Sequence, residues 1–140
     1  MKKLLLTLAF CLFNIVCIFA RTIVYESEAF CKGVDTAYGV EFSKWESNSD
    51  YNISMIYDGY SLKKFILSTG SETIDVFTVE DENSSSDPKS SRKAYLVQSE
   101  ALSKGAWIGL EKDTKGNLHF YIHYPEDVIG FILRYVTTII

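Results

Sequence analysis

The stretch Ala106 to Tyr124 reads AWIGLEKDTKGNLHFYIHY, and it decides the fold class. Apolar and polar side chains alternate on both sides of a short polar segment, 113–117, in which the glycine comes late. Alternation with a period of two is typical of a half-buried strand. A short loop with a late glycine is typical of a hairpin. The stretch therefore predicts two antiparallel strands, 106–111 and 118–124, joined by a turn.

The same alternation recurs along the chain, whereas helical periodicity is nearly absent. The alternating stretches are rich in Val, Ile, Tyr, Phe and Thr, which suit a pleated, half-buried surface. The turns between them are too short for crossover helices. We therefore predict an all-β domain, a compact antiparallel β-barrel or β-sandwich of about eight or nine strands. The other strands expected are 22–28, 38–46, 51–57, 62–68, 73–80, 93–99 and 128–137. We also expect one helical turn at 99–104, with Ser99 as its cap and Gly105 as its stop.

The N-terminus, MKKLLLTLAFCLFNIVCIFA, has two lysines, an uncharged apolar run and a small residue, Ala20, at its end. This order is typical of a secretory signal peptide. We therefore expect residues 1–20 to be removed and the rest to be exported to a periplasmic or extracellular location. Ile18 is bulky where a small residue is usual, so an uncleaved membrane anchor is the alternative. Membrane contact is expected only through this segment, if it stays uncleaved.

The remaining segment, 21–140, has room for one core and not for two. We expect a single β domain in which residues 81–92, DENSSSDPKSSR, form a mobile loop. Only Pro88 is apolar in this loop, so it cannot contribute to a core. A protease should cut the folded protein here first.

Charge and cysteine content argue against a nucleic-acid-binding protein and against a fold stabilised by internal disulfides. Without Lys2 and Lys3 the chain has 12 basic and 18 acidic side chains, a net charge of −6. Such an acidic domain lacks the basic patch of a nucleic-acid-binding protein. Cys31 would be the only cysteine left, so no internal disulfide can form. We expect Cys31 to be a small buried hydrophobic residue, the alternative being a thiol that pairs with another chain.

Both histidines lie in the strand 118–124. In a strand, His119, Tyr121 and His123 share one face, opposite an apolar face that should point to the core. The two histidines are about 13 Å apart at the backbone, too far to share a metal about 2 Å from each imidazole. We therefore expect no metal and no cofactor. Together with Trp107 across the hairpin, the row is our candidate binding surface, and an ordinary solvated strand face is the alternative.

The sequence shows no nucleophile elbow, phosphate-binding loop or metalloprotease motif. We therefore do not expect an enzyme. Seventeen aromatic residues follow the signal segment, and an eight-stranded barrel can hold one small apolar ligand. We expect an exported non-catalytic small-ligand-binding module of the cell envelope or secreted space. The alternative is an envelope protein–protein or cell-wall interaction protein that uses the surface strip on 118–124, and no oligomeric state follows from the pattern.

Overall fold

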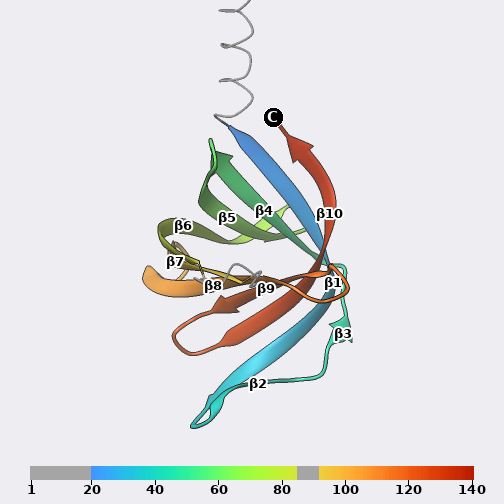
Figure 1. Cartoon of the computed structure of the whole chain (residues 1–140), viewed down its shortest axis with the longest axis vertical. Coiled ribbons are helices and arrows are strands. Elements are labelled where there is room, and N and C mark those ends of the chain that lie inside the picture. Colours follow the sequence, from blue (N-terminus) through green and yellow to red (C-terminus); the bar gives the residue numbers. More distant parts are fainter. Residues whose placement is uncertain (1–19, 85–91) are drawn as a thin grey trace, which may run out of the picture.

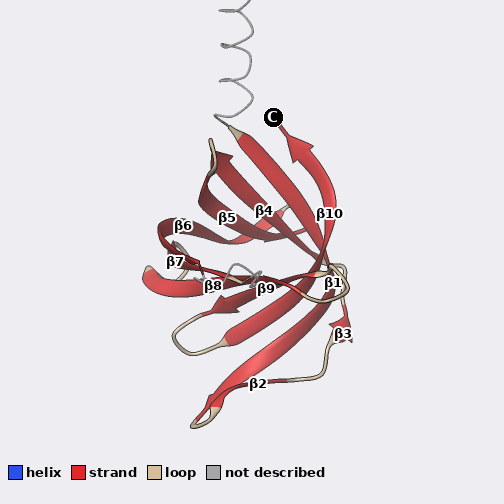
Figure 2. Cartoon of the chain, in the orientation of Figure 1, coloured by secondary structure: helices blue, strands red, loops and turns tan. Residues whose placement is uncertain are grey.

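The computed structural model describes residues 20–84 and 92–140, and Figure 1 shows their arrangement. The expected signal peptide lies outside the described residues except for Ala20, as do residues 85–91 of the expected loop. The described parts of the chain contain no helix of the length and hydropathy that a membrane span requires. They consist of strands, loops and turns (Figure 2).

Eight antiparallel strands close into a barrel in the order β10–β9–β8–β7–β6–β5–β4–β1, and β10 pairs back with β1. Two extra strands, β2 and β3, pair only with β1. This result confirms the all-β prediction and selects the barrel over the sandwich. The strands are β1 (Arg21–Thr36), β2 (Gly39–Phe42), β3 (Glu46–Ser47), β4 (Tyr51–Asp58), β5 (Ser61–Thr69), β6 (Glu72–Ser84), β7 (Lys93–Ser99), β8 (Lys104–Lys112), β9 (Leu118–His123) and β10 (Val128–Ile139).

The first strand is much longer than the sequence predicted. β1 pairs with β10 along most of its 16 residues, and its other edge pairs in turn with β4, β3 and β2. Its register with β10 shifts between Val24 and Tyr25 and again between Ser27 and Ala29. A register shift moves the following side chains to the other face. The period-two pattern therefore breaks near residue 28, where the predicted strand stopped.

The predicted strand 38–46 was wrong as a single element. Residues 39–42 form β2 and residues 46–47 form β3, with a connection between them that is not a strand. β2 turns back on β1 through a tight hairpin at Gly39, whose φ of 118° favours glycine. The hairpin extends beyond the barrel at the bottom of Figure 1. Phe42 at the end of β2 and Trp45 in the connection that follows lie against the outer wall.

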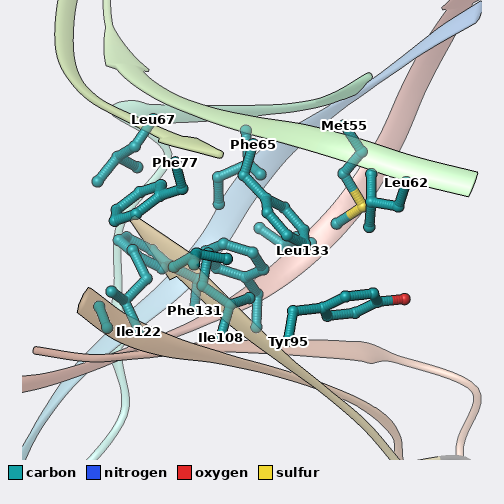
Figure 3. Packing of buried hydrophobic residues seen from close by; sticks show 14 residues of the cluster. Met55, Leu62, Phe65, Leu67, Phe77, Tyr95, Ile108, Ile122, Phe131 and Leu133 are labelled. Carbon is teal, nitrogen blue, oxygen red and sulfur yellow. The ribbon is translucent and has the colours of Figure 1, made fainter. Parts of the chain in front are cut away.

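Side chains fill the barrel interior. Phe65, Phe77, Phe120 and Phe131 have no exposed surface, and they meet from four different strands. Figure 3 shows this cluster, with aliphatic side chains such as Met55 and Leu133 packed around the rings. An eight-stranded barrel is just wide enough for side chains to occupy its centre. The centre of the barrel is therefore the hydrophobic core of the domain.

Two further local predictions were wrong. Residues 81–84 were expected in the mobile loop, but they extend β6 and pair with β7. Backbone pairing with β7 holds these residues in the sheet. Residues 99–104 were expected to form a helical turn capped by Ser99. The Ser99 hydroxyl does accept a hydrogen bond from the Leu102 N–H, 3.3 Å away, but the chain turns at Ser103 (φ 52°) and enters β8 without a helix.

Candidate functional site

The four predicted site residues lie on the outer wall of the barrel. Trp107 on β8 is directly opposite His123 on β9, so the predicted pairing across the hairpin is present. Trp107 is 45% exposed. The three β9 residues are each less exposed than Trp107. The structure therefore places His119, Tyr121, His123 and Trp107 on one face, and we call these four residues the outer strip.

The end of β2 and the connection after it cover part of the outer strip. The ring of Phe42 lies 5.1 Å from the ring of Tyr121, and the ring of Trp45 lies 5.5 Å from that of His119, measured between centroids. Gly130 leaves room for the ring of Tyr121 on this wall. A Cβ atom on Gly130 would lie 2.9 Å from the Cys31 sulfur and 2.9 Å from the ring of Tyr121. The middle of the strip is therefore a second packed cluster outside the barrel and not a solvated face.

Hydrogen bonds join His119 to Tyr121 within this cluster and to Asp113 in the turn before β9. His119 Nε2 is 2.9 Å from an Asp113 carboxylate oxygen, and His119 Nδ1 is 3.0 Å from the Tyr121 hydroxyl. Because a carboxylate only accepts, Nε2 must donate, and in the neutral ring Nδ1 then accepts from Tyr121. Burial raises the pKa of Tyr121, with further contributions from Cys31 and Glu111. The two hydrogen bonds therefore orient the rings of His119 and Tyr121. The raised pKa of Tyr121 does not favour its use as a nucleophile.

A shallow recess lies beside Tyr121 on the same outer wall. It has a volume of about 390 Å³. Ala94 and Gly109 are its smallest lining residues, and Arg92 and Glu111, also in its lining, form an ion pair of 3.0 Å. We call it the outer recess. It is open to solvent on one side of the strip, so it could accept a side chain or ring from a partner. The full lining is Arg92, Lys93, Ala94, Gly109, Leu110, Glu111 and Tyr121.

Neither metal coordination nor an exposed thiol is found in the described part of the chain. No three His, Cys, Asp or Glu side chains within residues 20–84 and 92–140 are close enough to hold a metal ion together. Cys31 is 1% exposed, as expected for a small buried hydrophobic residue. Burial also raises the pKa of its thiol. Pairing with another chain would require the buried thiol of Cys31 to become exposed.

A second site, which the sequence did not predict, lies at one end of the barrel. There the turn after β7 and the loop after β9 approach the start of β6 around a cavity of about 310 Å³. We call it the Asp75 cavity. Its lining residues are Ile74, Asp75, Ala101, Leu102, Lys104 and Tyr124–Asp127.

Asp75 links the elements around this cavity. Its side chain is buried, with 2% of the residue exposed. One carboxylate oxygen accepts the N–H groups of Val76 and Ala101, at 2.8 and 3.0 Å. The other accepts the hydroxyls of Ser99 and Tyr124, at 2.6 and 2.9 Å. A buried carboxylate is tolerated when hydrogen bonds compensate its lost hydration, so Asp75 fixes the cavity wall.

The hydrogen bond to Asp75 also holds the phenol of Tyr124 in place. Burial raises the pKa of Tyr124 far above its ordinary value, and the hydrogen bond to Asp75 raises it further. Tyr124 therefore remains a neutral donor, with its ring between the core residue Phe77 and the cavity. This arrangement is rigid and satisfied, which suits a binding wall better than a proton-transfer group.

One sequence signal could have revealed the second site. Asp75 shares its strand face with Phe77, which is buried, so a charged residue stands at a position where alternation requires an apolar one. Such a residue needs several donors nearby. Which donors these are depends on loops distant in sequence, and the pattern of residues does not show that. Comparison with known proteins adds no further assignment, because no protein family, no curated protein and no solved structure matches this chain.

Proposed function

We propose that this protein is an exported non-catalytic binding module of the cell envelope or secreted space, which holds a small ligand in the Asp75 cavity. The main support is the contrast between a filled barrel interior and an open cavity with apolar walls at the end of the barrel. Ligand pockets are usually preformed, largely apolar concavities with a few fixed polar groups. The exported location is inferred from the N-terminal sequence alone.

The test is native mass spectrometry of the protein purified from the compartment in which it accumulates. We expect a small molecule to accompany the chain. Ala101→Phe should fill the cavity from an exposed position and remove the added mass. Ala94→Phe is the matched control, because it makes the same change in the outer recess and should retain the ligand. An added mass that survives Ala101→Phe, or no added mass in the wild type, would contradict the proposal.

A second candidate function is an envelope protein–protein or cell-wall interaction through the outer strip. The outer recess beside Tyr121 and the half-exposed Trp107 favour it. Half-exposed aromatic side chains on a rigid wall are common anchors at protein interfaces. The same two variants separate the candidates. Here Ala94→Phe should abolish co-sedimentation with envelope or cell-wall material, and Ala101→Phe should leave it unchanged.

A further inference from the structure

We propose that the ligand of the Asp75 cavity is a small organic cation, an ammonium group carried by an aromatic or branched aliphatic body. This inference rests on the proposed function, because it names the ligand class for the same cavity. It follows from the cavity's apolar walls, its balance of charges and its tyrosine ring.

The apolar walls and the volume of the cavity determine the size and polarity of the ligand's body. Ile74 on β6 and Leu102 in the turn after β7 are 41% and 47% exposed, and both line the cavity together with Pro125. A bound apolar group would remove this exposed surface from water, which is favourable in proportion to the area buried. The volume of about 310 Å³ is at the lower end of the range for ligand pockets, roughly 300–1,000 Å³. The body is therefore small and apolar.

The charged residues around the cavity determine which charge the polar group of the ligand carries. Three acidic residues, Asp75, Glu126 and Asp127, line the cavity against one basic residue, Lys104. Lys104 is exposed at the first position of β8, where its flexible stem can carry the ammonium into water. The loop that bears the acidic pair is fixed, because the Tyr124 N–H donates to the Asp127 carbonyl at 2.8 Å. A concave site with an excess of acidic groups attracts cations.

Tyr124 adds a second feature that suits a cation. The face of a phenol ring attracts an ammonium within about 6 Å of its centroid. Tyr124 donates its hydroxyl hydrogen to the Asp75 carboxylate, which makes the ring more electron-rich. The oxygens of Asp75 already accept four hydrogen bonds. We therefore assign Asp75 an electrostatic role, and the ammonium hydrogen bonds to the carboxylates of Glu126 and Asp127.

The experiment compares three probes with nearly the same body and different charge: 2-phenylethylammonium, 2-phenylethanol and 3-phenylpropionate. Each is titrated into isotope-labelled protein purified from the compartment in which it accumulates, and the backbone amides are followed by NMR. We expect shifts at Ala101, Leu102 and Tyr124. The ammonium probe should bind roughly fivefold or more tightly than the alcohol, and the carboxylate should bind most weakly.

Charge-neutral variants test the assignment of the acidic pair. Glu126→Gln with Asp127→Asn keeps the shape of the loop and should weaken ammonium binding roughly fivefold. The affinity for the alcohol should stay unchanged. The matched control is Asp58→Asn with Glu80→Gln, which removes the same charge from exposed positions outside the cavity. That control should leave the affinities of all three probes unchanged.

The possible outcomes separate this inference from the proposed function. Equal binding of the three probes at the cavity, or a preference for the carboxylate, overturns the cation while the proposed small-ligand site stands. An ammonium affinity that falls as much in the control as in the cavity variant also overturns it. No shift at the cavity with any probe, together with no accompanying mass in the wild type, overturns the proposed function itself.

Discussion

The ring of Trp45 stands edge-on against the imidazole of His119, with centroids 5.5 Å apart and ring planes at 90°. Trp45 also lies 6.4 Å from the ring of Tyr121, so one tryptophan covers both residues. Trp45→Ala should expose this outer cluster and destabilise the protein by about 1–2 kcal/mol. Hydrogen exchange should increase more at residues 39–47 than in the barrel strands.

Trp107→Ala is the control for this prediction, because Trp107 is 45% exposed on the same wall. We expect it to cost less than Trp45→Ala in urea unfolding. Equal costs for the two tryptophans, with unchanged exchange at 39–47, would show that the connection after β2 does not stabilise the wall.

The hydrogen bonds of Asp75 predict a contrast between two substitutions. Asp75→Ala leaves the N–H groups of Val76 and Ala101 without their acceptor, and should cost about 3 kcal/mol or more in urea unfolding. Asp75→Asn can keep one oxygen for those N–H groups and present its NH₂ to the hydroxyls of Ser99 and Tyr124, which can rotate to accept. We expect it to cost about 1 kcal/mol. Similar losses for Ala and Asn would contradict this account.

The pKa of Asp113 predicts how stability depends on pH. The hydrogen bond from His119, followed by that from the Asn117 N–H, lowers the pKa of Asp113 from 3.8 to about 2. A carboxyl whose pKa is lower in the folded state stabilises the fold at higher pH, and this contribution is lost as pH falls from about 4 to about 2. Asp113→Asn should therefore lower the urea midpoint at about pH 6 and lower it less at about pH 2. A loss of the same size at both pH values would show that the Asp113 carboxylate charge does not contribute.

The sequence predicted the strands well where alternation was unbroken and less well where tertiary contacts decided the structure. The hairpin of β8 and β9 was found because its turn and both alternating flanks are local features. β1 was cut short because its register shifts disturb the alternation. For the candidate site, the shared face of His119, Tyr121 and His123 was predictable from their spacing. Its cover of Phe42 and Trp45 was not, since those contacts depend on how β2 and the connection after it fold back onto the barrel.

Two glycines on the outer wall give a matched test of that packing. A Cβ atom on Gly130 would collide with the Cys31 sulfur and the Tyr121 ring, both at 2.9 Å. Gly130→Ala should therefore force Tyr121 and its cover outward and cost about 1–3 kcal/mol. A Cβ atom on Gly109 would meet only Tyr121, at 3.9 Å, so Gly109→Ala should change stability by less than about 0.5 kcal/mol. Urea unfolding of both variants decides the point, and a Gly130→Ala protein as stable as Gly109→Ala would mean that Tyr121 is not packed against β10.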